Sequence, residues 1–224
     1  MDARDSIEER ARRFFSEIPP GVSVIAAAKM RTPDEVRAVL ATGISIVGEN
    51  YVQEAEAIQA AVSRAVAKWH FIGHLQRNKA KDAVRLFDLI QTVDSVRLAE
   101  AVDAASHALG RVTPILVEVN SGRESQKSGV LPEEAADLVR TLETLEAVRV
   151  VGLMTMGPLA ADPEALRAPF RETKRLFDEL GGHGLGHAQM QILSMGMSDS
   201  YRVAIEEGAT MVRVGTALFG PRMR

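Results

Sequence analysis

The chain alternates between short apolar runs and longer amphipathic stretches over its whole length. The apolar runs are rich in β-branched residues, are bounded by turn-forming residues and are too short to be helices. Runs of this kind predict buried strands. We expect eight strands, over residues 22–27, 44–47, 69–72, 89–93, 114–119, 148–154, 190–193 and 211–214.

The stretches between the apolar runs carry signals that begin and end helices. Three of them start with a proline at the first helical position and an acidic residue after it, at residues 32–34, 131–133 and 162–164. Glycines that follow helical stretches predict left-handed C-terminal caps at Gly43, Gly110 and Gly208. We also expect an additional helix over about residues 5–17, which would pack across one end of the fold.

Strands that are apolar throughout and alternate with helices predict a parallel sheet that is covered on both faces. Eight strand–helix units in 224 residues match an α/β fold of the TIM type, a (β/α)8 barrel. The alternative is a doubly wound open sheet, which normally has fewer strands for this length. No proline-rich, serine-rich or low-complexity segment suggests a linker, so we expect residues 1–224 to form a single domain.

The composition then narrows the classes of function. Cysteine is absent, which excludes disulfides, thiol catalysis and cysteine-based metal sites. A net charge of −3 indicates no basic surface for nucleic acid or for an anionic membrane. The charged N-terminus lacks the apolar core of a signal peptide, and no apolar run approaches the roughly 20 residues of a membrane span. We therefore expect a cytoplasmic protein without nucleic-acid, membrane or metal partners.

In a (β/α)8 barrel the functional groups lie at the carboxyl ends of the strands. Lys29 follows the first expected strand, directly after three alanines. One interpretation is a lysine whose stem covers apolar surface while its amine reaches solvent. The other is an amine that forms a Schiff base with a carbonyl, next to small side chains that leave room for a flat ring. Lys29 alone does not decide between them.

The last two expected strand ends suggest an anion site. Ser198 precedes the helical stretch at residues 199–207, so we expect it to cap that helix, while Gly215 allows close backbone approach and Thr216 adds a hydroxyl. Loops after strands seven and eight of such barrels, together with a helix N-terminus, recurrently bind phosphate. The alternative is that these residues only cap and turn. A phosphate site opposite Lys29 fits a phosphosugar aldolase or a protein that binds pyridoxal 5′-phosphate (PLP).

Several longer motifs carry a specific resemblance that covers essentially the whole chain. They are GENYVQE at 48–54, WHFIGHLQRNK at 69–79, GLM at 152–154, LSMGMS at 193–198 and VRVGTALFG at 212–220, with a further patch at Glu118, Val119, Asn120, Glu124, Lys127 and Gly129. On these motifs the chain resembles the pyridoxal phosphate homeostasis protein family, which is related to the N-terminal barrel of alanine racemase.

The resemblance implies a PLP-binding barrel of the alanine racemase type without that enzyme's second, β-rich domain. It implies that Lys29 carries PLP as a Schiff base and that Asn50 lies close to the ring. It also implies residues for the other two polar ends of the cofactor: Ser198, Gly215 and Thr216 for the phosphate, and Arg213 for the pyridine nitrogen.

The chain departs from the family pattern at two positions. After Lys29 the proline of the family motif is displaced by one residue, to Pro33, so the loop after the first strand can differ. Ser200 stands where an aspartate is usual, with Asp199 one place earlier. Neither departure removes a residue that the resemblance places at PLP.

The chemistry of these residues favours a carrier over an enzyme. PLP enzymes that use the ring as an electron sink place a carboxylate on the pyridine nitrogen. Arg213 is a cation that only donates, so it would leave that nitrogen unprotonated. Racemisation also needs a second acid–base group. In alanine racemase this group is a tyrosine of the β-rich domain, and the only tyrosines in this chain are Tyr51 and Tyr201. We expect a protein that stores PLP and passes it to apo PLP-dependent enzymes; the alternative is a PLP-dependent amino-acid racemase or lyase.

Overall fold

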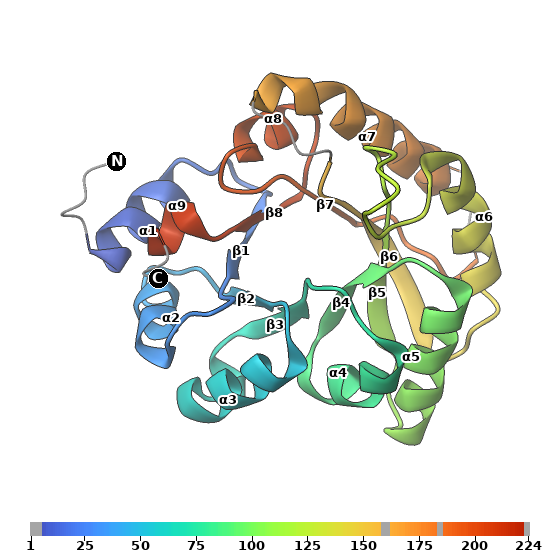
Figure 1. Cartoon of the computed structure of the whole chain (residues 1–224), viewed down its shortest axis with the longest axis horizontal. Coiled ribbons are helices and arrows are strands. Elements are labelled where there is room, and N and C mark those ends of the chain that lie inside the picture. The colour runs from blue at the N-terminus through green and yellow to red at the C-terminus, as the bar shows by residue number, and fades with distance from the viewer. Residues whose placement is uncertain (1–5, 158–161, 183–185, 222–224) are drawn as a thin grey trace.

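The computed structural model describes residues 6–157, 162–182 and 186–221. Within these ranges eight parallel strands close into a barrel in sequence order, from β1 through β8 and back to β1. Helices surround the ring of strands, as Figure 1 shows. The strands are β1 (Ser23–Ala27), β2 (Ile46–Glu49), β3 (Lys68–Phe71), β4 (Leu89–Val93), β5 (Thr113–Glu118), β6 (Val148–Thr155), β7 (Ile192–Met195) and β8 (Met211–Val214).

The helices alternate with the strands along the chain and form the outer layer. None of the helices in the described ranges is long and apolar enough to cross a lipid bilayer. They are α1 (Ile7–Ser16), α2 (Pro33–Leu40), α3 (Val52–Val62), α4 (Ala80–Leu86), α5 (Val96–Ala108), α6 (Pro132–Leu142), α7 (Arg167–Gly182), α8 (Tyr201–Glu206) and α9 (Thr216–Phe219), with 3₁₀ turns η1 (Arg64–Val66), η2 (Arg77–Lys79) and η3 (Pro163–Leu166).

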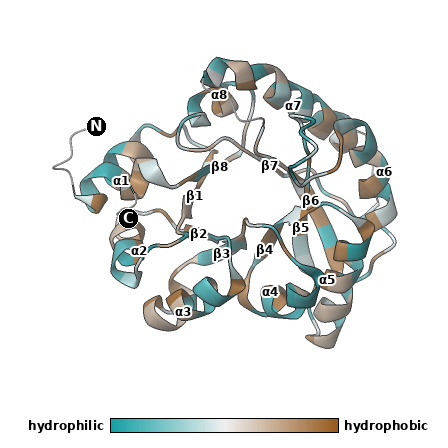
Figure 2. Cartoon of the chain, in the orientation of Figure 1, coloured by the Kyte–Doolittle hydropathy of each residue, from teal (hydrophilic) through white to brown (hydrophobic). Residues whose placement is uncertain are grey.

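The side chains of each strand alternate between two environments, as the two-residue period of a strand requires. One set packs between the strands and the helices, and it includes Val24, Val47 and Trp69. Figure 2 shows helices that mix hydrophobic and hydrophilic residues, as expected for helices with one buried face. The other set fills the inside of the barrel with two apolar clusters, formed by Ile25, Ile72 and Met211 and by Leu89, Leu116, Val151 and Met154.

The closed ring confirms the expected (β/α)8 barrel and excludes the doubly wound open sheet, because β1 pairs with both β2 and β8. Each of the eight predicted strands is present. However, β2 and β7 lie two residues later in the chain than predicted. The reason is that Glu49 and Ser194 are buried and lie inside these strands, whereas the apolar pattern treats a polar residue as the end of a strand.

The helix boundaries follow most of the predicted signals. Thr32 caps α2, because its hydroxyl accepts the Glu35 N–H at 3.3 Å while the Glu35 carboxylate accepts the Thr32 N–H at 2.7 Å. The helix predicted after Asp162 begins as the 3₁₀ turn η3 and continues as α7. The predicted glycine caps have the required positive φ, at Gly43, Gly110 and Gly208.

The additional N-terminal helix is present, but the prediction that it packs across one end of the barrel was wrong. α1 lies in the outer layer beside α2 and α9, as seen in Figure 1. The helix α9, which follows β8, has only four residues, so it leaves room in the outer layer next to β1. The buried side chains of Ala11 and Phe14 in α1 fill that room.

Candidate functional site

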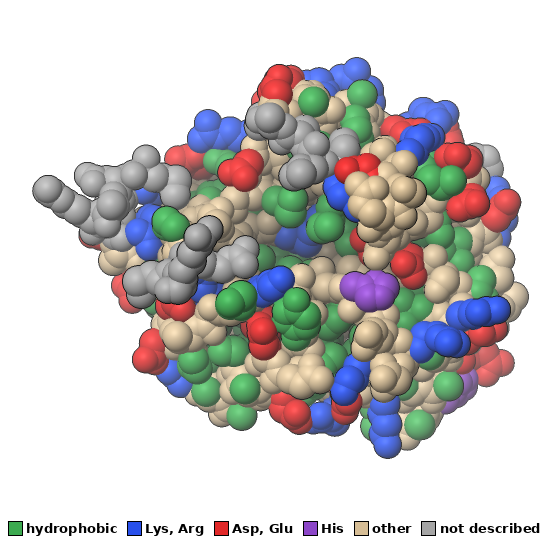
Figure 3. Space-filling view, in the orientation of Figure 1, with side chains coloured by type: hydrophobic (Ala, Val, Ile, Leu, Met, Phe, Trp, Pro, Cys, Tyr) green, Lys and Arg blue, Asp and Glu red, His purple; other side chains and the backbone are tan. Residues whose placement is uncertain are grey.

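The carboxyl ends of the strands meet at one end of the barrel, and this end gathers all the predicted site residues. They are Lys29 after β1, Asn50 after β2, Ser198 after β7, Arg213 within β8, and Gly215 and Thr216 after β8. Figure 3 looks onto this end and shows Lys and Arg side chains near its centre. The structure thus brings together residues that lie far apart in the sequence.

The backbone next to Lys29 is fixed by a hydrogen bond between strands, whereas the Lys29 side-chain amine has no polar partner among the described residues. The Ala28 N–H donates to the Gly48 carbonyl at 2.9 Å, which extends the β1–β2 pairing to the residue before Lys29. The lysine is half-buried, and its Nζ lies 5.1 Å from the centre of the Tyr51 ring. Among the described residues it makes no hydrogen bond and no ion pair with this amine. A lysine amine without a carboxylate partner is available to react with a carbonyl.

Asn50 forms one edge of a cavity beside Lys29. A Cβ on Gly73 would lie 2.3 Å from the Asn50 carbonyl oxygen, so a glycine is required where these two backbones meet. Asn50 and Tyr51 line a cavity of about 320 Å³ together with Lys79 and other residues of the loops after β2 and β3. Tyr51 therefore contacts both this cavity and the Lys29 amine.

The prediction that Ser198 caps the helix after β7 was wrong. That helix, α8, begins at Tyr201, and the turn before it uses Ser200, whose hydroxyl accepts the Met197 N–H at 3.0 Å. The Ser198 hydroxyl instead accepts the backbone N–H groups of Gly215 and Ala217, both at 3.2 Å. Its partners lie 17 and 19 residues further along the chain, which no local capping rule can anticipate.

Gly215 and Thr216 complete this group of donors at the end of β8. A Cβ on Gly215 would point toward Ala27, at 3.5 Å from its carbonyl oxygen, so a side chain there would extend over the space next to the end of β1. Thr216 is exposed at the first position of α9. The Ser198 hydroxyl accepts two backbone N–H groups and keeps its own proton to donate, so it and the Thr216 hydroxyl are donors suited to a phosphate.

Arg213 is buried inside the barrel and is held by three hydrogen bonds. Its Nη1 donates to the carbonyl and the hydroxyl of Ser194 at 2.9 and 2.7 Å, and its Nη2 donates to the Thr155 carbonyl at 2.8 Å. Burial lowers the pKa of Arg213 to about 10, and the charge of Glu118 opposes this shift. The guanidinium therefore remains a cation at neutral pH, and it can only donate.

Two buried carboxyl groups near this end of the barrel were not predicted as part of the site. Burial raises the pKa of Glu118 to about 7, and the charge of Asp94 adds to the shift while Arg213 opposes it. Burial raises the pKa of Glu49 to about 8; the charge of Glu54 adds to this shift and the Asn50 backbone N–H opposes it. Apart from this backbone contact, neither carboxylate oxygen of Glu49 has a hydrogen-bond partner among the described residues. The signal in the sequence is a carboxylate at the end of an otherwise apolar run.

The interior of the barrel also contains a group of polar residues that the sequence analysis missed. In the sequence, such a residue is marked by a polar side chain at an inward position of an otherwise apolar strand. They are His70 in β3, Gln91 in β4 and Ser194 in β7, and all three are buried.

The donor set fits PLP at each of the cofactor's three polar ends. The amine of Lys29 suits an aldehyde, and the hydroxyls of Ser198 and Thr216 suit a phosphate. The guanidinium of Arg213 suits an unprotonated ring nitrogen, because that nitrogen only accepts. The absence of a side chain at Gly215 leaves open the space between the Lys29 amine and the phosphate donors.

Comparison with known proteins agrees with this fit. Residues 3–223 match the family model described as "Alanine racemase, N-terminal domain". The chain is 40% identical over 199 residues to the pyridoxal phosphate homeostasis protein of Aquifex aeolicus, covering 89% of this chain and 86% of the relative. It is 35% identical over 211 residues to the protein of the same name from Synechocystis, covering 94% and 96%.

Solved structures show the same relationship. PipY of Synechococcus elongatus without PLP superposes with a TM-score of 0.90 at 37% identity, over 96% of this chain and 100% of that chain. The same protein with PLP bound gives 0.87 at 36% identity, with the same coverage. Alanine racemase of Clostridium difficile gives 0.83 at 15% identity over 99% of this chain and 61% of that chain, which shows a shared fold alone. The chain therefore belongs to the pyridoxal phosphate homeostasis protein family, with the barrel fold of the alanine racemase N-terminal domain.

Proposed function

We propose that this protein binds PLP, holds it reversibly as a Schiff base on Lys29, and stores and transfers the cofactor rather than catalysing a reaction. The observation that carries the proposal is the unpartnered amine of Lys29 at the same end of the barrel as the phosphate donors and Arg213. PLP bound in PipY, at 36% identity over the full length of that chain, supports it.

Each of the proposed site residues has a distinct task. Lys29 supplies the amine, and the small side chain of Ala27 at the end of β1 leaves room next to it. Ser198, Gly215 and Thr216 bind the phosphate, and Asn50 lies close to the ring. Arg213 donates to the ring nitrogen. PLP, when bound, supplies a reactive aldehyde and a ring able to accept electrons.

Two features support a carrier rather than an enzyme. The guanidinium of Arg213, charged at neutral pH, disfavours protonation of the ring nitrogen, which weakens the ring as an electron sink. Racemisation needs a second acid–base group on the far side of the substrate from the lysine. Tyr51 lies against Lys29 itself, and Tyr201 packs on Phe14 in the outer layer with ring centres 4.8 Å apart.

The proposed carrier has a defined setting. We place it in the cytoplasm, where the apo forms of PLP-dependent enzymes would receive the cofactor, and the absence of cysteine fits a reducing compartment. One domain over residues 1–224 would suffice for this task, since the strands of the single barrel are spread over the chain.

A second candidate function is a PLP-dependent amino-acid racemase or lyase. The observation that favours it is Glu118, a buried carboxyl near Arg213 whose pKa is raised by burial to about 7. Such a group can both hold and release a proton at neutral pH. Exchange of the α-proton of amino acids in deuterated water, at about 1 per second or faster, would give this function first place.

The absorbance spectrum of the purified protein before and after borohydride tests the proposed function. We expect a yellow protein whose visible band disappears on reduction, and a pyridoxyl group on the peptide that contains Lys29. A colourless protein that gains no band from added PLP would refute PLP binding. A cofactor-free aldolase, the remaining alternative, would be colourless and would be trapped by borohydride only with a carbonyl substrate.

A further inference from the structure

Four buried polar residues form a continuous chain of hydrogen bonds across the inside of the barrel. The Arg213 guanidinium donates to the Ser194 hydroxyl at 2.7 Å, and this hydroxyl donates to the Gln91 Oε1 at 2.8 Å. The Gln91 amide nitrogen lies 3.0 Å from the His70 Nδ1. These residues belong to β8, β7, β4 and β3, which lie on opposite sides of the closed ring.

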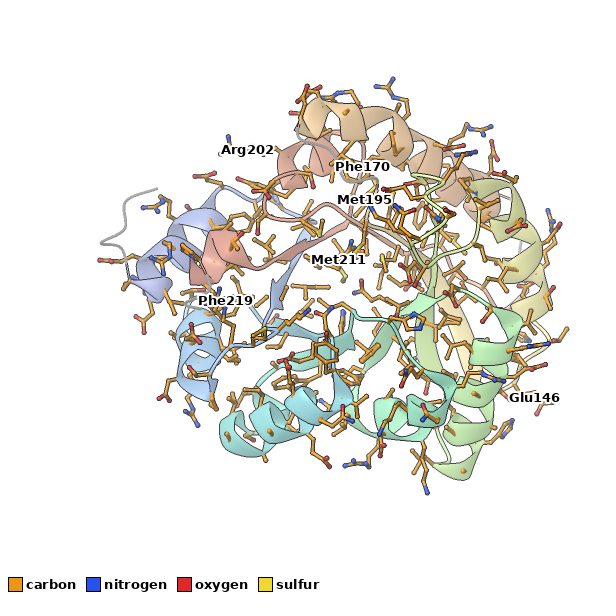
Figure 4. All side chains as sticks on the ribbon, in the orientation of Figure 1. Glu146, Phe170, Met195, Arg202, Met211 and Phe219 are labelled. Atoms are coloured by element: carbon orange, nitrogen blue, oxygen red, sulfur yellow. The ribbon has the colours of Figure 1, made fainter. Side chains whose placement is uncertain are left out.

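The direction of this chain is determined by Arg213. A guanidinium has no acceptor, so the Ser194 hydroxyl must accept from it, and the hydroxyl's own proton is free to be donated to the Gln91 Oε1. The amide oxygen of Gln91 is thereby occupied, and its NH₂ group faces His70. The same NH₂ group lies 3.3 Å from the sulfur of Met211, another acceptor, whose place inside the ring Figure 4 shows. His70 must then accept at Nδ1 and carry its proton on Nε2.

The surroundings of His70 agree with an acceptor. Burial lowers the pKa of His70 to about 4; the charge of Asp88 opposes this shift and that of Lys68 adds to it. A neutral imidazole has one free acceptor nitrogen, which this arrangement assigns to Nδ1. A charged imidazole would place two donors, on His70 and Gln91, against each other.

We propose that Ser194, Gln91 and His70 are positioning residues, which hold the Arg213 guanidinium through a hydrogen-bond relay of fixed direction so that its remaining N–H groups are available to the ring nitrogen of PLP. The proposal rests on the proposed function for its ligand, and on the protein alone for the relay. A set of polar residues that only fills the barrel would not discriminate between ligands that differ in the ring nitrogen alone.

The first test is the protonation of His70, measured by ¹⁵N NMR on the full-length protein without PLP. We expect a neutral ring with its proton on Nε2 at pH 7. In Gln91→Glu the carboxylate only accepts, so the His70 proton should appear on Nδ1. A wild-type His70 with its proton on Nδ1 would overturn the relay whether or not the protein binds PLP.

The second test compares PLP with its deaza analogue, in which a carbon replaces the ring nitrogen. Ser194→Ala should weaken PLP binding about tenfold, the loss of one buried hydrogen bond, and leave binding of the analogue unchanged. Ser194→Thr, which keeps the hydroxyl, should restore PLP binding. If Ser194→Ala does not fold, Gln91→Met replaces it, with an expected loss of about threefold that is again confined to PLP.

Ser106→Ala is the matched control. Ser106 is equally buried, and its hydroxyl bonds to Val102 and Thr113 on the outer side of the barrel, away from the relay. We expect this variant to bind both ligands like wild type. Equal losses for PLP and the analogue in Ser194→Ala, or equal wild-type affinities for the two, would overturn the relay and leave PLP binding intact. Failure of the wild type to bind PLP would refute the proposed function, and the NMR test would still decide the relay.

Discussion

Two sides of the barrel opening differ in how their polar groups are bonded. On the side of β7 and β8, the Arg213 guanidinium makes three hydrogen bonds and the Ser198 hydroxyl accepts two backbone N–H groups. On the side of β1 and β2, the Lys29 amine lies over the face of Tyr51 and makes no hydrogen bond or ion pair with the described residues. The Glu49 carboxyl has no hydrogen-bond partner among them beyond the Asn50 backbone. We call the β7–β8 side, whose polar groups are hydrogen-bonded within the protein, the bonded side, and we call the β1–β2 side the unbonded side.

The difference corresponds to two tasks. Groups that recognise the phosphate and the ring nitrogen bind best when they are fixed before the ligand arrives, because their ordering then costs nothing at binding. The group that forms and breaks a covalent bond with the cofactor must remain free to react. The backbone at Met30, next to Lys29, has a positive φ of 59°, which is uncommon for a residue other than glycine. The unbonded side thus contains both the reactive amine and backbone strain.

The largest expected effect is the loss of the covalent adduct in Lys29→Ala. Without the amine, no borohydride-stable pyridoxyl peptide should form, although PLP can still bind through the bonded side. Mass spectrometry of the reduced, digested protein measures this. Lys79→Ala is the matched control, because Lys79 is a half-buried lysine at the same end of the barrel. A pyridoxyl group that persists in Lys29→Ala would show that the reactive amine lies elsewhere.

The next effect concerns Glu49, whose pKa is raised to about 8 by burial. Between about pH 4.5 and pH 8 the unfolded chain ionises this carboxyl while the folded protein keeps its proton, so stability falls as the pH rises through this range. Glu49→Gln removes that cost. Relative to wild type, its free energy of unfolding should increase by about 4 kcal/mol between pH 4 and pH 8.

Denaturant titrations at the two pH values measure this difference. Glu100→Gln is the control, because the Glu100 side chain is exposed on α5 and makes no hydrogen bond or ion pair with the described residues. We expect no pH-dependent change for the control. An unchanged difference for Glu49→Gln would mean that Glu49 is ionised in the folded protein and has a partner there, and the two sides would then be bonded alike.

The fold was more predictable from the sequence than the bonding of the site. Apolar runs and glycine caps are local signals, and they predicted the eight strands and the helices between them. The number of strand–helix units then predicted the closed barrel. The partners of Ser198 lie 17 and 19 residues further along the chain, after β8, so the sequence predicted a helix cap where the structure has a contact with the start of α9. The relay from Arg213 to His70 crosses the barrel, and only the closed ring brings its members together.

On the bonded side, Ser198→Ala and Thr216→Val should each weaken PLP binding about tenfold, since a charge-assisted hydrogen bond contributes roughly 1.5–3 kcal/mol. Pyridoxal, which lacks the phosphate, should bind each variant as it binds wild type. Fluorescence titration with both ligands measures this. Ser95→Ala, which removes the hydroxyl that caps α5 at the same end of the barrel, is the control. Equal losses for both ligands would assign Ser198 and Thr216 to the fold instead of the phosphate.

The smallest expected effect concerns Tyr51, the residue whose ring faces the Lys29 amine on the unbonded side. A cation over an exposed aromatic face gains about 0.5–1 kcal/mol, and this gain favours the free ammonium over the form bound to PLP. Tyr51→Leu should therefore strengthen PLP binding by about two- to fivefold. Tyr51→Phe keeps the ring and should bind PLP like wild type. If Tyr51→Leu weakens PLP binding instead, Tyr51 contributes to holding the cofactor. The unbonded side would then take part in recognition as well as in covalent chemistry.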